Sequence, residues 1–237
     1  MKISEGTIRS DLISLHEYNV NIDTREIYLH GYYASGGDVE EAGVDYRMAT
    51  VFIKNLNFLN SLSNSAILIH QHTIGGTWND GIAIYDSLLM SKSETAIVCY
   101  AEASSMSSIT IQAATIRALM PNIEFMVHYG FYGADGIPSQ VHSLVDRYKQ
   151  IDTIMLNIYA RRCIHGKFFQ NKRMNERDVI KYIRDKIQRN TDWFMNAEEA
   201  VFYGFADLVL DSKGINDIYS LRQSVKKKNG KTKRKRN

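Results

Sequence analysis

The 237-residue chain has few cysteines, few prolines and no long apolar run. Its two cysteines, Cys99 and Cys163, are too few for a disulfide framework, and Cys99 lies in an apolar, strand-like segment, so we expect a reducing compartment. No apolar run approaches the roughly 20 residues of a membrane-spanning helix, and residues 1–6 show no signal-peptide core. Together these absences predict a cytoplasmic protein without a membrane partner.

Basic residues are unevenly placed along the chain. Eight of the 29 lysines and arginines fall in residues 226–236, so the remaining chain carries 21 basic against 26 acidic residues. We expect residues 213–237 to be a disordered appendage that serves solubility or contacts an acidic partner or nucleic acid. No aromatic residue lies among these charges, so base stacking is unsupported and nucleic acid is not the expected partner.

Strand-like and helical patterns alternate along the first half of the chain. Apolar runs typical of strands cover residues 26–29, 66–69, 96–100 and 123–128, and helical spacing covers 45–60, 80–90 and 105–120. This alternation favours a single α/β domain with a parallel sheet and crossover helices. A long amphipathic helix is predicted over 138–162, and the charge-dense segment 163–190 is predicted to contain a further helix at about 175–189.

A serine stands at one of these strand-to-helix junctions. The apolar run 96–100 leads through small residues to Ser105, where helical spacing begins, and the run 123–127 delivers His128. A serine and a histidine at the ends of core strands can form an activated nucleophile. Each residue also has an ordinary interpretation, because serine commonly caps helices and a histidine at a strand end is commonly a hydrogen-bonded polar residue.

Two glycines lie at an earlier strand-to-helix turn. Gly75 and Gly76 follow the apolar run 65–72 and precede the helical run 81–89. Glycine permits backbone conformations closed to other residues and allows a ligand to approach closely. A backbone N–H at this turn, paired with the N–H of Met106, would give a two-donor oxyanion hole. A plain tight turn is the alternative interpretation.

Five segments in order resemble the proteolytic subunit of the Clp protease (ClpP), a family of serine peptidases in the ClpP/crotonase superfamily. The resemblance runs from about residue 25 to residue 210. It is carried by residues 25–31 (Arg-Glu-Ile-Tyr-Leu-His-Gly), 75–76 with 81–86 (Gly-Gly, then Gly-Ile-Ala-Ile-Tyr-Asp), 103–106 (Ala-Ser-Ser-Met), 126–128 (Met-Val-His) and 197–207 (Ala-Glu-Glu-Ala-Val-Phe-Tyr-Gly-Phe-Ala-Asp).

The resemblance implies an α/β fold, a spiral of ββα units, with a Ser-His-Asp peptidase site. Matched residue by residue, Ser105 falls on the nucleophile, His128 on the general base and Asp192 on the acid, with Gly76 and Met106 on the oxyanion donors. Without the resemblance, Asp192 would be interpreted as a solvated carboxylate ahead of the next helix. The implied substrate is a polypeptide cleaved inside an oligomeric chamber, with no metal and no other cofactor.

The resemblance also divides the chain. It implies a peptidase domain over residues 25–212, with a handle at about 129–162 that combines a strand from 129–137 with the long helix. The charged segment at about 163–190 reads as an insertion, residues 1–24 lack the pattern of the family's gating loop, and 213–237 follow the domain. The implied partners are further copies of the chain, in stacked seven-membered rings, and an ATP-dependent AAA+ unfoldase such as ClpX or ClpA.

Departures from the family pattern keep other functions open. The family's glycines on either side of the nucleophile block are Ala101 and Ser107 here, and its proline before the glycine pair is Ile74. The alternatives are a catalytically inactive ring subunit, structural or regulatory, and a stand-alone viral-type processing protease of the same fold. A crotonase-like enzyme acting on coenzyme A thioesters is a third, but it needs no serine nucleophile. His70 and His72 alternate on a strand as zinc ligands do, yet no third ligand lies near them in the sequence.

Overall fold

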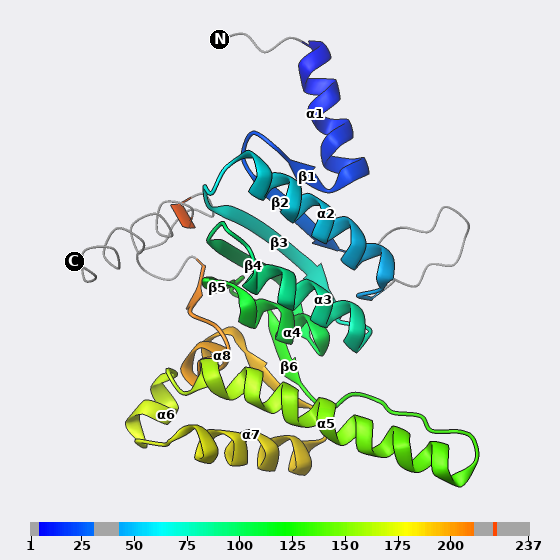
Figure 1. Cartoon of the computed structure of the whole chain (residues 1–237). Helices are drawn as coiled ribbons and strands as arrows, with labels where there is room; N and C mark the ends of the chain where they lie inside the picture. Colours follow the sequence, from blue (N-terminus) through cyan, green and yellow to red (C-terminus); the bar gives the residue numbers. More distant parts are fainter. Residues whose placement is uncertain (1–4, 31–42, 211–219, 222–237) are drawn as a thin grey trace, which may run out of the picture.

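The computed structural model describes residues 5–30, 43–210 and 220–221, which form a mixed α/β structure (Figure 1). The predicted appendage at 213–237 therefore lies almost entirely outside the described residues. No described helix is both long and apolar enough to cross a membrane. The helices are α1 (Glu5–Tyr18), α2 (Tyr46–Leu62), α3 (Trp78–Leu89), α4 (Met106–Thr110), the 3-10 helix η1 (Ile111–Ala113), α5 (Pro138–Cys163), α6 (Lys167–Asn171), α7 (Glu176–Asn190) and α8 (Ala197–Tyr203). The strands are β1 (Val20–Asn21), β2 (Glu26–His30), β3 (Ile67–Thr73), β4 (Thr95–Ser104), β5 (Ile116–Leu119), β6 (Glu124–Val127), β7 (Trp193–Asn196) and β8 (Leu208–Val209).

One sheet of eight strands organises the described residues. Its main path runs β1-β2-β3-β4-β5-β8. Strands β2, β3, β4, β5 and β8 are parallel to one another, and β1 is antiparallel at the edge. β6 pairs parallel with the end of β4, and β7 pairs antiparallel with β6. The predicted α/β fold with a parallel sheet is confirmed. Because neighbouring strands are parallel, the C-terminal ends of β3, β4 and β6 meet at one edge, where ligands of such sheets usually bind.

Strand β4 serves two parts of the sheet. Residues 96–99 pair with β5, whereas residues 102–104 pair with β6. Between them Ala101 has a φ of 57°, and the pairing of β4 with β3 shifts register between Gln71 and Thr73. The left-handed residue turns the strand, so β4 leaves one neighbour and meets the other. This turn aims the end of β4 at the end of β6.

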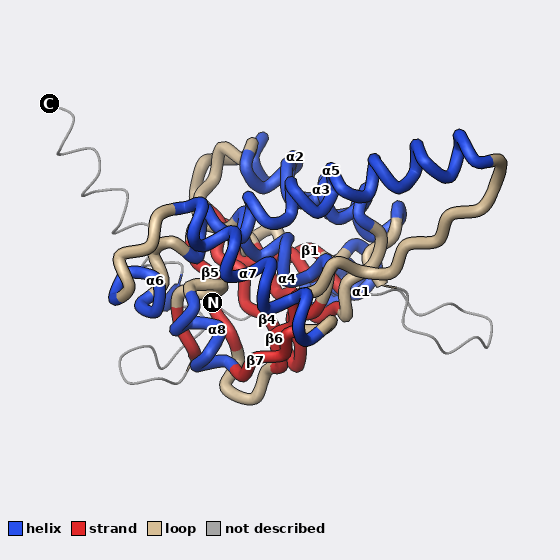
Figure 2. The backbone as a smooth tube through the Cα atoms, turned by 90° about the horizontal axis from the view of Figure 1, so that it is seen from below, coloured by secondary structure: helices blue, strands red, loops and turns tan. Residues whose placement is uncertain are grey.

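Helices α2, α3 and α4 cover one face of the sheet (Figures 1 and 2). The side chain of Asp45 caps α2 by accepting a hydrogen bond from the N–H of Met48 at 2.8 Å. Apolar residues at helical spacing, Phe52 among them, bury one face of α2. On α3, a Cβ atom at Gly81 would lie 2.0 Å from the side chain of Met106. The missing side chain therefore lets α3 pack closely against the start of α4.

The predicted helix over residues 105–120 is wrong in its second half. Helix α4 ends at Thr110, η1 follows, and Ala114 takes an extended ψ of 151° that leads into β5. All four residues of β5 are buried, and a short buried run has no periodicity that separates a strand from a helix. Arg117 in β5 donates to the carboxylate of Asp207 at 2.7 and 3.2 Å, which ties the strand to the segment after α8.

Helix α5 is the predicted long helix, and its two halves differ. Its second half, from Ile151 on, contributes buried residues to the core, whereas its first half projects from the body of the molecule (Figure 2). The strand predicted within residues 129–137 is not formed. This segment instead follows the projecting half of α5, where Tyr132 stacks on Tyr148, and it has no strand partner in the described part of the chain. In this single copy Gly130 and Gly136 have φ of 84° and 138°, outside the extended region.

The charged segment after α5 contains the predicted second helix, α7. A capping box begins it, since the side chain of Asn175 accepts from the N–H of Asp178 at 3.1 Å and the carboxylate of Asp178 accepts from the N–H of Asn175 at 3.4 Å. Its apolar stripe, Val179, Ile183 and Ile187, is buried, and α7 packs beside α5. An aromatic cluster joins this segment to β7 and α8, and it consists of Phe168, Phe169, Tyr182, Trp193 and Tyr203.

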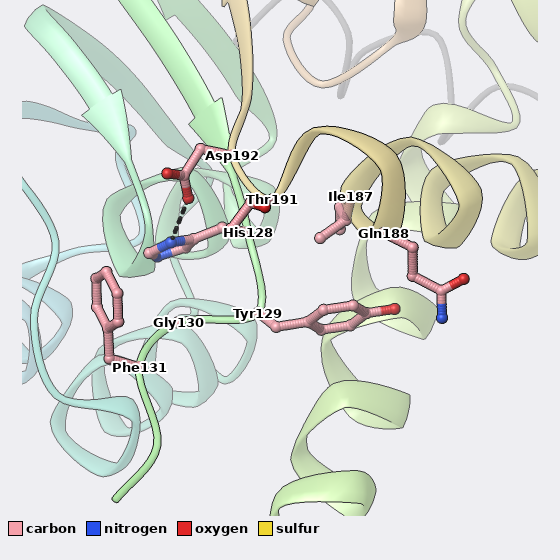
Figure 3. A pocket seen from close by; sticks show the side chains of 8 residues that line it. All are labelled: His128, Tyr129, Gly130, Phe131, Ile187, Gln188, Thr191 and Asp192. Atoms are coloured by element: carbon pink, nitrogen blue, oxygen red, sulfur yellow. Dashed lines mark hydrogen bonds and ion pairs between the residues drawn. The ribbon is translucent and has the colours of Figure 1, made fainter.

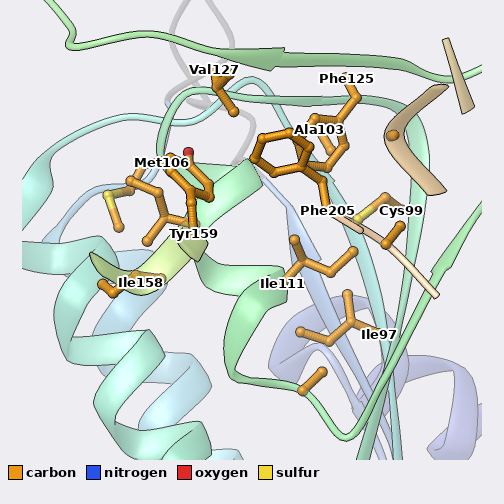
Figure 4. Packing of buried hydrophobic residues seen from close by; sticks show 14 of the residues in the cluster. Ile97, Cys99, Ala103, Met106, Ile111, Phe125, Val127, Ile158, Tyr159 and Phe205 are labelled. Carbon is orange, nitrogen blue, oxygen red and sulfur yellow. The ribbon is translucent and has the colours of Figure 1, made fainter. Parts of the chain in front are cut away.

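The main hydrophobic core reaches the turn that follows β4. Figure 4 shows Met106 of α4, Tyr159 of α5 and Phe205 after α8 packed in one cluster. All three side chains are buried, and the rings of Tyr159 and Phe205 meet edge to face at 5.3 Å. The backbone around Ser105 is therefore supported by packing from three separate elements.

Candidate active site

Ser105 lies in a sharp turn between β4 and α4. Its φ of 54° and ψ of −126° are sparsely populated for a residue with a side chain. The backbone around it holds this conformation: the Ser105 N–H donates to the carbonyl of Met126 at 3.1 Å, and the Ser105 carbonyl accepts from the N–H of Ser108 at 3.0 Å. Such a turn projects the serine hydroxyl away from the sheet, at the sheet's C-terminal edge.

His128 reaches Ser105 because β6 lies beside the end of β4. Ser104 pairs with Met126 in this parallel ladder, so the residues that follow the two strands emerge together. The Nε2 atom of His128 lies 2.8 Å from the Oγ atom of Ser105. The imidazole is largely buried, with 12% of its side-chain surface exposed. The pair thus has the geometry required for proton transfer between hydroxyl and imidazole.

Asp192 comes from the opposite direction, on the residue before β7. Strand β7 is antiparallel to β6 and pairs Trp193 with Val127. Asp192, which directly precedes β7, therefore lies beside His128, which directly follows β6. The Oδ1 atom of Asp192 is 3.0 Å from the Nδ1 atom of His128 (Figure 3). The charged segment that contains α7 thus leaves Asp192 within hydrogen-bond reach of His128, with the Asp192 side chain about one third exposed.

The glycine pair passes next to the Ser105 turn. Gly75 has a φ of 106°, and a Cβ atom there would lie 2.7 Å from the Cβ of Ser105 and 2.9 Å from the N atom of Met106. Gly76 has a φ of 153°, and its Cβ would lie 2.3 Å from the backbone N and O atoms of Val44. Within the described chain the N–H groups of Gly76 and Met106 donate no hydrogen bond. The Met106 N–H is thus available to a ligand oxygen beside Ser105, whereas the close contacts of Gly76 are with Val44.

The buried amide side chains of Gln71 and Gln112 hydrogen-bond to α4, and the sequence analysis did not identify them. The Nε2 atom of Gln71 donates to the carbonyl of Ser107 at 3.0 Å, and its Oε1 atom accepts from the hydroxyl of Thr110 at 2.7 Å. Gln112 donates to the carbonyl of Ser108 at 2.8 Å. A polar glutamine in the middle of an apolar strand was the available signal, because a buried amide requires partners.

A pocket opens beside His128 and Asp192 (Figure 3). It has a volume of about 230 Å³, and its walls come from the segment after β6 and from the end of α7. The ring of Phe131 meets the imidazole of His128 edge-on at 6.1 Å, and burial raises the pKa of the Tyr129 hydroxyl. The lining residues are His128, Tyr129, Gly130, Phe131, Ile187, Gln188, Thr191 and Asp192. The pocket suits an apolar side chain of a ligand that reaches Ser105.

The two histidines of β3 lie in different surroundings. The imidazole of His70 stacks on Tyr28 with centroids 4.5 Å apart and hydrogen-bonds the hydroxyl of Tyr100 at 2.8 Å, whereas His72 is exposed. In the described ranges, no group of three or more histidine, cysteine or acidic side chains is placed to hold a metal ion. His70 thus contacts two tyrosines, and its Nε2 atom faces the carboxylate of Glu26 at 3.6 Å.

Comparison with known proteins assigns the chain to a family. The family described as Clp protease matches residues 39–213. The chain belongs to the Clp protease family. It is also similar to a curated ATP-dependent Clp protease proteolytic subunit from Carsonella ruddii (strain PV), at 26% identity over 200 residues that cover 84% of this chain and 90% of that protein. The predicted site residues all lie within the part that matches the Clp protease family.

Proposed function

We propose that this protein is a Clp-type serine endopeptidase subunit. The observation that carries the proposal is the hydrogen-bonded series from Ser105 Oγ through the His128 imidazole to Asp192, with distances of 2.8 and 3.0 Å. Membership of the Clp protease family supports a peptidase, and this geometry favours the serine type among peptidase mechanisms.

The proposed reaction follows from these positions. His128 Nε2 takes the proton of Ser105 as Oγ attacks the carbonyl carbon of a peptide bond, while Asp192 orients the imidazole and stabilises its charged form. The carbonyl oxygen becomes an oxyanion between the N–H groups of Gly76 and Met106. His128 then protonates the leaving amine, and water hydrolyses the acyl-enzyme by the reverse sequence of proton transfers.

The proposal extends to the assembly. The projecting half of α5, together with residues 129–137, has the form of the family's handle, so we propose that copies of this chain interlock there into stacked rings, seven-membered as the family resemblance implies. Residues 129–137, which find no strand partner in the described chain, would pair with the same segment of another copy. An AAA+ unfoldase such as ClpX or ClpA would deliver unfolded polypeptide into the chamber with ATP. Both cysteines are free and buried, in keeping with the cytoplasm as the compartment.

A fluorophosphonate probe tests the proposed chemistry, because it reacts with an activated serine. The protein is separated by size into assembly states, and each state is labelled for the wild type and for Ser105→Ala. We expect labelling of a large assembly, and none for the variant. An assembly that forms without labelling would instead indicate an inactive ring subunit, and labelling that persists in Ser105→Ala would place the nucleophile elsewhere.

A further inference from the structure

A buried tyrosine on α5 is hydrogen-bonded to the Ser105 turn through one serine. The hydroxyl of Tyr159 lies 2.7 Å from the Oγ atom of Ser108, and this Oγ donates to the carbonyl oxygen of Ser105 at 2.6 Å. A serine hydroxyl has a single hydrogen, which Ser108 directs to Ser105, so Tyr159 is the donor in the first bond. The hydrogen bonds therefore run from Tyr159 through Ser108 to the Ser105 carbonyl.

That carbonyl belongs to the peptide group that carries the Met106 N–H. In a planar trans peptide the C=O and N–H bonds point in opposite directions, so fixing one fixes the other. The Ser105 carbonyl accepts both the N–H and the hydroxyl of Ser108. Two donors hold the rotation of this peptide plane and polarise its N–H, which strengthens that N–H as a donor.

The tyrosine is built into the core in a way that suits this role. Its side chain is fully buried, and burial raises the pKa of the Tyr159 hydroxyl, so the group remains a proton donor at neutral pH. Its ring packs against Phe205, which holds it independently of the hydroxyl. Loss of the hydroxyl alone should therefore leave the packing in place.

We propose that Tyr159, acting through Ser108, is a positioning residue for the oxyanion donor at Met106. The inference rests on the proposed peptidase function and adds two residues to it. It also connects α5 to the chemistry, because the helix that carries Tyr159 is the one whose other half projects from the body (Figures 2 and 4).

The test compares Tyr159→Phe and Ser108→Ala with the wild type, each with its assembly state checked by size. Tyr85→Phe is the matched control, since it removes a partly buried tyrosine hydroxyl on α3 that makes no hydrogen bond to the Ser105 turn in the described chain. Loss of one oxyanion donor typically costs 10²–10³-fold in kcat. A donor that is only misaligned should cost less, so we expect kcat on a short fluorogenic peptide to fall about tenfold in both variants with KM nearly unchanged. The control should keep the wild-type values.

A pair of inhibitors gives a readout that a purely structural role would not produce. Ser105 Oγ adds to the carbonyl carbon of a peptide aldehyde, and the serine hydroxyl proton passes to His128. The former carbonyl oxygen then lies in the oxyanion site. The matching peptide amide binds without this step. We expect Tyr159→Phe to weaken the aldehyde about tenfold and the amide less than twofold.

The outcomes separate the inference from the function on which it rests. An active wild type with Tyr159→Phe and Ser108→Ala unchanged, or with aldehyde and amide weakened equally, would overturn the positioning role alone. A wild type that neither cleaves peptides nor labels would overturn the proposed function, and the positioning role with it.

Discussion

Replacing Ser105 by glycine and by alanine separates the chemistry of this residue from the strain of its backbone. Both variants lose the hydroxyl and its hydrogen bond to His128, but only alanine keeps a Cβ atom at φ 54° and ψ −126°. A residue in such a region costs about 1–3 kcal/mol. Glycine relieves this cost, although it destabilises by about 0.4–1 kcal/mol through the greater freedom of the unfolded chain. We therefore expect Ser105→Gly to be more stable than Ser105→Ala by about 0.5–2 kcal/mol.

Calorimetry on assemblies of equal size and concentration measures this difference. At roughly 2–4 °C per kcal/mol for a chain of this length, Ser105→Gly should melt roughly 1–8 °C above Ser105→Ala. Position 107 is the control, because Ser107→Gly and Ser107→Ala also both lose a buried hydroxyl, while Ser107 lies within α4. There glycine should be the less stable variant by about 1 kcal/mol. If Ser105→Gly melts no higher than Ser105→Ala, the turn is not strained and the reasoning fails.

Three further predictions concern the surroundings of Ser105 and the anchor of β5. Asp192→Asn should lower kcat by up to about 10⁴-fold while the fold persists, since the imidazole loses the partner that sets its tautomer; steady-state kinetics and circular dichroism check both parts. Gly75→Ala should abolish peptidase activity, because its Cβ would lie 2.7 Å from the Cβ of Ser105, and hydrolysis of a fluorogenic peptide measures the loss. Burial raises the pKa of Asp207, but the hydrogen bonds and charge of Arg117 lower it further, so the pKa lies below its usual value. Asp207→Asn should therefore lower the free energy of unfolding by about 2–3 kcal/mol at neutral pH, as measured by denaturant unfolding. Because the folded-state pKa is lowered, this difference should be present above about pH 4 and should shrink as the pH falls further and the wild-type carboxylate becomes protonated.

The parts of the fold that the sequence predicted well are those with a strong local pattern. Helix α2 has its cap at Asp45 and α7 has its cap at Asn175, and both bury one apolar stripe, so their ends and inner faces could be predicted from spacing alone. Strand β4 and the turn at Ser105 were also expected, since an apolar run ended in small residues before a helical pattern.

The errors have a different physical origin. Strand β5 was predicted as helix because four buried residues have the same apolar pattern in either structure, and only pairing with β4 and β8 decides between them. That decision depends on contacts between residues far apart in sequence. The strand predicted within residues 129–137 is a different case, because its implied partner is another copy of the chain, so it stays a prediction.

The candidate site shows the same division. Ser105, His128, Met106 and an N–H at the glycine pair could be proposed from local motifs at strand ends. The choice of Gly76 and of Asp192 needed the family resemblance, because the sequence around Asp192 is typical of a solvent-exposed segment. Among the residues that support the site, Gln71 had a signal in the sequence, a polar side chain within an apolar strand, whereas Tyr159 had none. The role of Tyr159 comes from a buried hydrogen bond across 51 positions of sequence, which no spacing pattern records.

The fluorescence of Trp193 can report whether the segment that carries Asp192 is docked. The chain has only two tryptophans, Trp78 and Trp193, and the second directly follows Asp192. Its indole is 6% exposed, and it lies against the ring of Tyr203 and under the ammonium of Lys186 on α7. Detachment of α7 would expose this indole to water and shift its emission to longer wavelength. With Trp78 replaced by phenylalanine, fluorescence would therefore report in real time whether the segment that carries Asp192 is docked, in solution and without a substrate.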